Sequence, residues 1–216
     1  MIWLIGNKGM LGSELSQLLE KSKVSFVGSD FEVDITDLSA LEQFAEKRQI
    51  NWIINCAAYT AVDKAEENIE FCRSLNVLGA ANIAACAKKI GAKLIHISTD
   101  YVFDGKGITV DGKTRPYRED DTTNPIGVYG LTKRDGEIEV LEKNPRSYII
   151  RTAWLYGKHG NNFVHTMIRL MNERPEIKVV NDQRGSPTWT GDLASAVLAV
   201  IKAADSQGGK IPFGRL

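Results

Sequence analysis

Two residues four positions apart, Tyr129 and Lys133, form a pair suited to proton transfer. At that spacing, two side chains lie one turn apart on the same face of a helix. A free tyrosine has a pKa of about 10 and exchanges protons poorly at neutral pH. A nearby ammonium group favours the phenolate, so we expect Lys133 to lower the pKa of Tyr129. The same spacing is common on solvated helix faces, so its meaning depends on the surrounding motifs.

A glycine-rich turn, Gly6 to Gly12, directly follows the first apolar run. We expect Gly6 to allow a tight turn and Gly9 to let backbone N–H groups approach a pyrophosphate. Gly12 would let the following helix pack closely on the strand. Plain strand-to-helix turns also contain glycines, but the position in the first strand–helix unit favours a dinucleotide site. The spacing is G-x-x-G-x-x-G.

Charged residues near this turn favour different cofactors. Asp30 ends the second expected strand, where a carboxylate would bind the adenosine ribose of NAD. Lys8 lies inside the turn and would instead meet the 2′-phosphate of NADP. Asp34 and Ile35 would supply a polar contact and an apolar shelf for the adenine. Asp30 and Asp34 are also ordinary cap and turn residues, and we leave NADPH and NADH both open.

Small and hydroxyl-bearing residues end the next two expected strands. Ala57 and Ala58 would let a flat cofactor lie against the backbone. One strand later, Thr99 would hold a substrate carbonyl oxygen beside Tyr129. Tyr129 would then give its proton as hydride arrives from the nicotinamide, and Lys133 would hydrogen-bond the nicotinamide ribose.

Short runs rich in Ile and Val alternate with amphipathic stretches, and most of the runs lack the alternation of a half-exposed strand. This pattern predicts an α/β fold with a Rossmann-like, doubly wound parallel sheet. The expected strands are Ile2–Ile5, Val24–Val27, Trp52–Asn55, Leu94–Ile97, Tyr148–Arg151 and Lys178–Val180. Helices are expected around residues 11–19, 38–45 and 80–87. A further helix would have Asn124 as its N-cap and Pro125 as its first residue.

Two regions break this alternation. Residues 98–124 are long and polar for a connection, and such loops are usually functional or mobile. Near the C-terminus, a helix is expected over residues 192–204. It is followed by Gly208-Gly209 and by a strand that begins at residues 211–213.

The composition argues against several classes of protein. Among 216 residues, Lys plus Arg number 27 and Asp plus Glu number 27, which argues against a strongly basic nucleic-acid-binding protein. No apolar run approaches the roughly 20 residues that span a bilayer. The first six residues read as a core strand rather than a signal peptide.

The cysteines and histidines form no metal-type pattern. Cys56, Cys72 and Cys86 are odd in number and lack a C-x-x-C pair, which predicts reduced thiols in a cytoplasmic protein. His96 lies inside an apolar run, and we expect it to be a hydrogen-bonded core residue.

Seven segments, spread over nearly the whole chain, carry a family resemblance. They are residues 6–12, 55–66, 98–105, 128–133, 151–156, 160–163 and 181–188. With these motifs the sequence resembles the extended short-chain dehydrogenase/reductase superfamily, and closely resembles the dTDP-4-dehydrorhamnose reductases within it. The segments A-Y-T-A-V-D-K-A-E and S-T-D-Y-V-F are far more specific than the superfamily-wide motifs. The resemblance implies NADPH- or NADH-dependent reduction of the 4-keto group of dTDP-4-dehydro-6-deoxy-L-mannose, giving dTDP-L-rhamnose.

The motifs and the resemblance together give the expected site residues. The cofactor-binding residues are Gly6, Lys8, Gly9, Met10, Leu11, Gly12, Asp30, Asp34, Ile35, Ala57, Ala58, Tyr59, Thr60, Tyr129 and Lys133. The residues that face the sugar nucleotide are Thr99, Asp100, Trp154 and Arg184. Trp154 also follows an expected strand end, where an aromatic face stacks well on a sugar ring. The catalytic residues are Tyr129 as proton donor, its partner Lys133, and Thr99.

The resemblance also implies a division of the chain. Residues 1–150 would form an NAD(P)-binding Rossmann domain, and residues 151–216 would supply parts of a substrate-binding lobe interleaved with the last Rossmann strands. The chain ends before the family's usual length, so we expect this lobe to be truncated. Some members form dimers through a divalent metal, and Glu14 matches one acidic position. We predict no metal, leave a homodimer open, and expect a dTDP-sugar as partner, with no nucleic acid or membrane.

Other functions on the same fold stay open. A nucleotide-sugar epimerase or 4,6-dehydratase belongs to the same superfamily, but a dehydratase would need an acidic pair beside the catalytic hydroxyl. Thr99-Asp100 supplies only one carboxylate. A non-catalytic regulatory subunit would keep the fold and bind a partner enzyme, whereas the intact Thr99, Tyr129 and Lys133 favour an enzyme.

Overall fold

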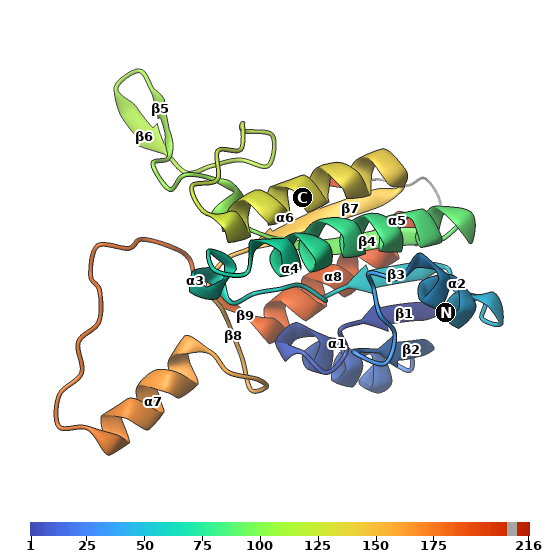
Figure 1. The fold of residues 1–216 in the computed structure, drawn as a ribbon, viewed down its shortest axis with the longest axis horizontal. Helices are drawn as coiled ribbons and strands as arrows, with labels where there is room; N and C mark the ends of the chain where they lie inside the picture. The colour runs from blue at the N-terminus through green and yellow to red at the C-terminus, as the bar shows by residue number, and fades with distance from the viewer. Residues whose placement is uncertain (207–210) are drawn as a thin grey trace.

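A six-stranded parallel sheet forms the centre of the computed structural model, which describes residues 1–206 and 211–216 (Figure 1). Its strands are β1 (Ile2–Ile5), β2 (Phe26–Ser29), β3 (Trp52–Asn55), β4 (Lys93–Thr99), β7 (Ser147–Thr152) and β10 (Gly214–Arg215). They lie in the order β10-β7-β4-β3-β1-β2, and every neighbouring pair is parallel. The order reverses direction at β1, which confirms the predicted Rossmann-like, doubly wound sheet.

Helices cover both faces of this sheet. The first face carries α2 (Leu38–Glu46), α5 (Ala80–Lys89) and α6 (Val128–Lys143), and the second carries α1 (Met10–Lys21) and α8 (Thr190–Asp205). Within β1, Trp3 and Ile5 join the core of the first face, whereas Ile2 and Leu4 join the core of the second. Both faces are buried, and this explains why the strand sequences show no polar alternation.

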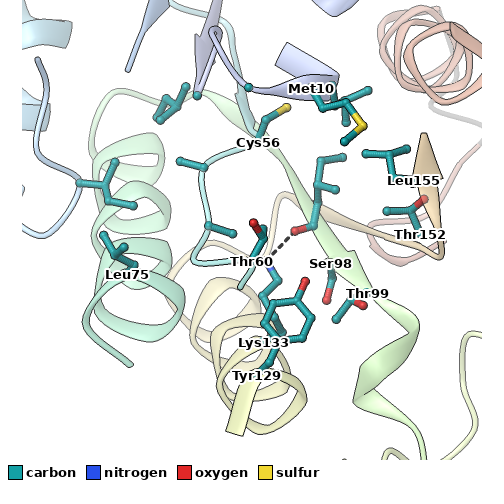
Figure 2. Close-up of a pocket in the computed structure, with 18 of the residues that line it drawn as sticks. Met10, Cys56, Thr60, Leu75, Ser98, Thr99, Tyr129, Lys133, Thr152 and Leu155 are labelled. Atoms are coloured by element: carbon teal, nitrogen blue, oxygen red, sulfur yellow. Dashed lines mark hydrogen bonds between the residues drawn. The ribbon is translucent and has the colours of Figure 1, made fainter. Parts of the chain in front are cut away.

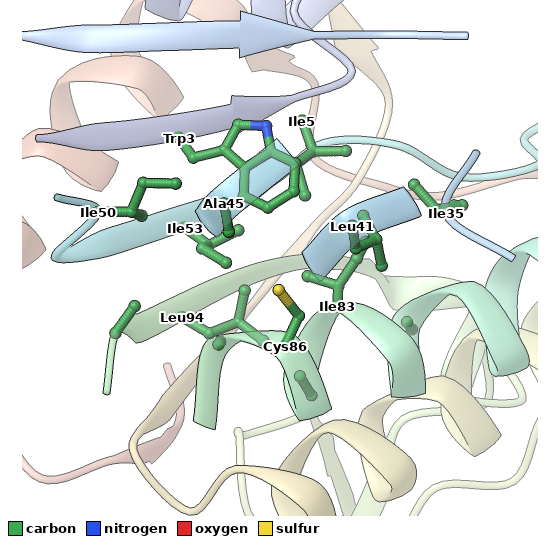
Figure 3. Close-up of a cluster of buried hydrophobic side chains, with 14 of the residues drawn as sticks. Trp3, Ile5, Ile35, Leu41, Ala45, Ile50, Ile53, Ile83, Cys86 and Leu94 are labelled. Atoms are coloured by element: carbon green, nitrogen blue, oxygen red, sulfur yellow. The ribbon is translucent and has the colours of Figure 1, made fainter. Parts of the chain in front are cut away.

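The core of the first face lies between β1, β3 and β4 on one side and α2 and α5 on the other (Figure 3). Trp3 is fully buried and stacks on Phe44, with 4.6 Å between the ring centroids. Its indole Nε1 donates to the Ser29 hydroxyl at 2.8 Å, so the one polar group of the ring is satisfied. These contacts fix β1 and β2, from which the glycine turn and Asp30 extend.

The remaining elements lie at the carboxyl edge of the sheet or beyond it. They are α3 (Val62–Ala65), α4 (Ile69–Arg73), the π-helical turn η1 (Ser74–Gly79), the 3-10 helix η2 (Asp100–Val102), the hairpin of β5 (Ile108–Val110) and β6 (Lys113–Arg115), the parallel pair β8 (Leu155–Tyr156) and β9 (Thr188–Trp189), and α7 (Phe163–Glu173). The hairpin occupies part of the predicted loop 98–124. In Figure 1, α7 lies apart from the sheet, and none of its residues is buried.

The expected positions of most elements are confirmed, and the differences have local causes. Strand β2 begins at Phe26 instead of Val24, and the last strand begins at Gly214 instead of residues 211–213. Gly208 and Gly209 lie outside the described residues. The strand predicted at Lys178–Val180 is wrong: these residues are exposed and form no ladder, since a short apolar run becomes a strand only beside a partner.

The predicted start of α6 is also wrong. The helix begins at Val128 with Gly127 as its N-cap, not at Asn124 and Pro125. The Asn124 amide nitrogen donates to Asp104 at 3.1 Å, and its backbone N–H donates to Val102 at 2.9 Å. These tertiary bonds hold Asn124 against residues 102–104, and the helix begins only after Gly127.

None of the described helices has the length and hydropathy that a membrane span requires.

Candidate active site

A cleft of about 750 Å³ opens at the carboxyl edge of β1, β3 and β4. It extends from the glycine turn to the N-terminal end of α6, and strands β4 and β7 supply its inner wall (Figure 2). This is the edge of a doubly wound sheet where ligands bind. All of the predicted site residues line the cleft except Gly12, Tyr59 and Arg184.

The glycine turn forms a cradle between β1 and α1. Gly6 has a φ of +77°, and a Cβ there would lie 2.8 Å from the Ala57 backbone nitrogen. A Cβ on Gly12 would overlap the Gly6 carbonyl oxygen, which explains why Gly12 lies outside the cleft yet shapes it. Gly9 is the N-cap of α1 and offers no side-chain cap, so the first N–H groups of the helix are left for a ligand.

Charged residues surround the outer end of the cleft. The Asp30 carboxylate accepts the backbone N–H groups of Lys8 and Phe31, both at 3.0 Å. The Lys8 ammonium pairs with Glu32 at 3.2 Å, and these side chains are 69% and 53% exposed. Asp30 therefore stabilises the glycine turn and also lines the cleft. Glu32 is a third charged residue at this end, and it was not among the predicted site residues.

Two further predicted residues at this end have defined local bonds. The Asp34 carboxylate accepts from the backbone N–H of Thr36 at 2.8 Å and from its hydroxyl at 2.7 Å. Asp34 is thus a turn residue that also lines the cleft, whereas Ile35 is buried and packs against Gly79.

The middle of the cleft is formed by the segment after β3. Ala57, Ala58 and Thr60 line it, together with Cys56. Tyr59 does not line it. The backbone of Tyr59 is held by the buried Asn76, whose amide accepts from the Tyr59 N–H at 2.8 Å and donates to its carbonyl at 3.2 Å. Asn76 lies in the π-helical turn η1, a type of irregularity frequent at functional sites.

Tyr129 and Lys133 project from the first turns of α6 toward the inner end of the cleft (Figure 2). The Lys133 ammonium donates to the Ile97 carbonyl at 2.8 Å, and the residue is only 2% exposed. Thr99 ends β4 beside them. Its hydroxyl donates to Asp100 and accepts from the Tyr101 N–H, both at 3.2 Å. The three predicted catalytic residues therefore lie together at one end of the cleft.

The predicted lowering of the Tyr129 pKa is wrong for this structure. Burial raises the pKa of Tyr129 to about 12. The neighbouring Thr99 hydroxyl lowers it, whereas Asp100 acts in the raising direction. Lys133 bonds the Ile97 carbonyl and makes no hydrogen bond to the phenol. A phenol with this raised pKa stays protonated at neutral pH, which is the state that a proton donor requires.

Lys133 and Asp100 are also shifted by burial. Burial lowers the pKa of Lys133 to about 8, although Glu137 acts in the opposite direction. Burial raises the pKa of Asp100, while its hydrogen bond from Thr99 lowers it. Such shifts concentrate at functional sites, because a charge there is held in a poorly solvated space.

A buried ion cluster lies directly behind the predicted catalytic residues. Glu137 is fully buried on α6, and it follows Tyr129 and Lys133 at the same spacing of four. Its carboxylate accepts from Ser98 at 2.6 Å, from Arg151 at 2.7 and 2.8 Å, and from Arg215 at 3.0 Å. Burial alone would raise the pKa of Glu137, but the bonds from Arg151 and Ser98 outweigh it and lower that pKa. The cluster thus ties α6 to β4, β7 and β10.

Trp154 and Arg184, the two residues after β7 that are predicted to contact the sugar nucleotide, differ in their relation to the cleft. Trp154 lines the cleft, is 45% exposed and has a φ of +45°. Gly185 lies against its indole, and the Thr188 N–H donates to the Trp154 carbonyl at 3.3 Å. Arg184 is exposed and outside the cleft, so its predicted nucleotide contact has no counterpart in the cleft lining.

Several lining residues were not selected from the sequence. They include Phe31, Cys56, Phe71, Leu75, Ser98, Tyr101 and Thr152. Ser98 and Tyr101 flank Thr99 and Asp100, so proximity to that motif was an available signal. Phe71 lies in α4 and Leu75 in η1, and only the tertiary fold brings them to the cleft.

No group of three or more His, Cys, Asp or Glu side chains among residues 1–206 and 211–216 is placed to hold a metal ion.

Comparisons with known proteins identify the family of this chain. The family model described as the RmlD substrate binding domain matches residues 1–212. A dTDP-4-dehydrorhamnose reductase of Streptomyces griseus is 46% identical over 206 residues, which cover 94% of this chain and 66% of the relative. A dTDP-4-keto-6-deoxy-D-glucose reductase of Streptomyces niveus is 41% identical over 203 residues, which cover 93% of this chain and 68% of that relative.

A solved structure extends the comparison. The dTDP-4-dehydrorhamnose reductase of Bacillus anthracis, in complex with NADP, superimposes with a TM-score of 0.89 at 40% identity. The match covers 99% of this chain and 72% of that one. This chain spans 60–69% of the length of eight curated relatives with 40–46% identity to it. These findings confirm the resemblance drawn from the motifs, and the chain belongs to the RmlD substrate binding domain family.

Proposed function

We propose that this chain binds NADPH or NADH in the cleft. The glycine cradle, the uncapped N-terminus of α1 and the row of small residues after β3 fit a dinucleotide. Gly6, Gly9, Met10 and Leu11 would hold the pyrophosphate, and Asp30 and Lys8 would face the adenosine ribose. The B. anthracis relative was crystallised with NADP, which supports the same site here. When bound, the dinucleotide supplies the hydride.

We further propose that the reaction is reduction of the 4-keto group of dTDP-4-dehydro-6-deoxy-L-mannose to dTDP-L-rhamnose. The names of the relatives support this substrate class. The observation that carries the proposal is the convergence of Tyr129, Lys133 and Thr99 at one end of a cleft whose other end is the glycine cradle.

Each residue then has a defined task. Thr99 holds the carbonyl oxygen of the substrate, and the protonated Tyr129 phenol gives that oxygen its proton while the carbonyl carbon accepts hydride. The Lys133 ammonium holds the nicotinamide ribose and faces the phenolate that remains. Asp100 and Trp154 contact the sugar nucleotide, and the indole face of Trp154 covers the sugar ring.

The organisation of the protein is part of the same proposal. Residues 1–150 would bind the cofactor, and residues 151–216 would contribute to a substrate-binding lobe. The three cysteines are all free thiols, which supports a reducing, cytoplasmic location. We also propose that the chain can form a homodimer, and sedimentation measurements of its mass in solution would test this.

The test separates binding from turnover. The purified chain is first titrated with NADPH and NADH, and then dTDP-4-dehydro-6-deoxy-L-mannose is added while nicotinamide absorbance is followed. We expect saturable cofactor binding and a steady loss of absorbance. The keto-sugar dTDP-4-dehydro-6-deoxy-D-glucose is the competing substrate, chosen because the S. niveus relative is named for it.

The possible outcomes are distinct. Faster turnover of the D-glucose derivative would overturn the proposed substrate but keep the reductase. Cofactor binding with a flat absorbance trace for both sugars would overturn the reductase proposal for this chain and favour the regulatory subunit. An absence of cofactor binding would overturn the proposed site as well.

A further inference from the structure

A line of buried polar groups leads from the segment after β3 to Lys133. Asn55 and His96 are each 1% exposed, and Lys133 is 2% exposed. The Asn55 side-chain oxygen accepts the Ala57 backbone N–H at 3.0 Å, and the Asn55 amide nitrogen lies 3.0 Å from His96 Nδ1. On the other side of the ring, His96 Nε2 lies 3.5 Å from Lys133 Nζ.

The direction of these bonds is fixed at the Ala57 end. A backbone N–H can only donate, so the oxygen of the Asn55 amide must face Ala57. The NH₂ group of Asn55 then faces His96 and donates to Nδ1, which must be the unprotonated nitrogen. Burial lowers the pKa of His96 well below its usual range, and Lys133 acts in the same direction. The ring is therefore neutral, and its one N–H is at Nε2.

We propose that His96 is a positioning residue, held by Asn55 as the Nε2–H tautomer, that donates toward Lys133 Nζ and makes the neutral amine the better satisfied form of Lys133. An ammonium group has three N–H donors and no lone pair. It can bond the Ile97 carbonyl, but it cannot bond a ring nitrogen that itself carries a proton. An amine accepts that N–H through its lone pair while still donating to Ile97.

The other titratable groups that act on Lys133 come from three elements. Glu137 on α6, Cys56 after β3 and Cys72 on α4 all favour the ammonium form. Burial and the proton on His96 Nε2 act against it. The balance makes Lys133 a group that changes charge close to neutral pH. The catalytic role of Lys133 comes from the proposed function, and in that respect the inference rests on it. The tautomer of His96 and the titration of Lys133 do not depend on it, because both are measured without turnover.

The direct test uses the unaltered chain. Nitrogen-15 NMR of histidine-labelled protein reports which ring nitrogen of His96 carries the proton. We expect a protonated Nε2 and an unprotonated Nδ1. A proton on Nδ1 would overturn the proposal, whether or not the protein reduces any sugar.

Variants test the action on Lys133, whose titration is followed by NMR of its side-chain carbon and nitrogen. In Asn55→Asp the carboxylate accepts from Nδ1–H, so the proton moves away from Nε2, which then accepts from the ammonium. We expect the pKa of Lys133 to rise by about one unit or more, and the pH profile of turnover to shift with it. The added carboxylate also acts directly, so the same change is repeated with His96→Leu.

The comparison between the two backgrounds decides the inference. If His96 transmits the effect, Asn55→Asp raises the pKa of Lys133 much less with leucine at position 96. An equal rise in both backgrounds would mean that the new charge acts directly on Lys133, and would overturn the proposal. Should a variant fail to fold, the tautomer measurement on the unaltered chain still decides it.

Discussion

Two lysines line the same cleft, but they lie in opposite environments. Lys8, at the outer end, has a side chain that is 69% exposed and pairs with Glu32. Lys133, at the inner end, is 2% exposed and bonds the Ile97 carbonyl. Water screens the first charge, so it can only adjust affinity modestly. The second charge is poorly solvated, and burial lowers the pKa of Lys133 to about 8. The comparison teaches that the buried end suits the proposed proton transfer, because a charge there is poorly solvated, whereas the exposed end suits discrimination between ligands.

The largest expected effect is at Tyr129. Tyr129→Phe removes the proposed proton donor and leaves the ring packing, so we expect turnover to fall by about 10²–10⁴-fold. The variant should still bind cofactor, because in the proposed function the phenol acts on the reacting oxygen and many other residues hold the dinucleotide. Steady-state kinetics and a cofactor titration measure the two effects. Tyr101→Phe is the matched control, since Tyr101 also lines the cleft, packs edge-on against Tyr129 at 5.5 Å, and takes no part in the proposed proton transfer. Equal turnover in both variants would remove Tyr129 from the mechanism.

The next effect concerns stability at the buried end. Glu137→Ala leaves Arg151 and Arg215 without their shared carboxylate. Breaking a buried ion pair by removing one partner costs about 3–5 kcal/mol of unfolding free energy. Urea unfolding at pH 7 measures this cost. Glu32→Ala at the exposed end is the control and should leave the urea midpoint unchanged. A similar midpoint for both variants would show that the cluster does not stabilise the fold.

A pH-dependent effect on stability follows from Lys133. Its pKa is about 8 in the folded chain, against 10.5 for an ordinary lysine. Between these two pH values the unfolded chain binds more protons than the folded chain. The buried Lys133 charge therefore lowers the unfolding free energy below about pH 8, and this loss disappears toward about pH 10.5. Lys133→Met should therefore be more stable than the unaltered chain at pH 7, by about 3 kcal/mol. That advantage should vanish by about pH 10.5.

The control for this prediction is the exposed lysine. Lys8→Met, which removes the exposed lysine of the same cleft, is measured over the same pH range. Urea unfolding at several pH values compares the two variants. A Lys133→Met difference that stays constant with pH would mean that Lys133 titrates normally in the folded chain.

The sequence predicts the buried part of the fold much better than the exposed part. Strands such as Trp52–Asn55 are buried on both faces, and their continuous apolar runs identify them. The run at Lys178–Val180 also ends in apolar, β-branched residues but has no partner strand, and partners are not visible in a local pattern. The start of α6 was misplaced for a related reason, since the bond between Asn124 and Asp104 is tertiary.

The candidate site divides in the same way. Gly6, Thr99, Tyr129 and Lys133 were found because backbone conformation and proton chemistry require particular residue types at particular spacings. Phe71 lines the cleft through shape alone, and many apolar residues would serve there. The direction of the Tyr129 pKa shift was missed because burial is a property of the fold. Glu137 could have been found, since it continues the spacing of four from Tyr129 and Lys133.

The smallest expected effect is at the exposed end, in the choice between cofactors. Glu32 pairs with Lys8, and Asp30 adds a second carboxylate nearby. Glu32→Gln frees the Lys8 ammonium and removes a negative charge that would repel a 2′-phosphate. We expect the NADPH-to-NADH preference to rise by about two- to fivefold, because exposed ion pairs are weak. Cofactor titrations at low and high salt measure the change, which should shrink as salt screens the charges.

A second variant separates the two charges at this end. Lys8→Met with Glu32 intact should shift the preference toward NADH, since only carboxylates then face the ribose. If both variants shift the preference in the same direction, Lys8 and Glu32 do not act as an opposed pair. A shift much larger than fivefold would be equally informative. It would mean that the bound cofactor shields the Lys8–Glu32 pair from water. The charges at the outer end of the cleft would then be poorly solvated, as the charge of Lys133 is at the inner end.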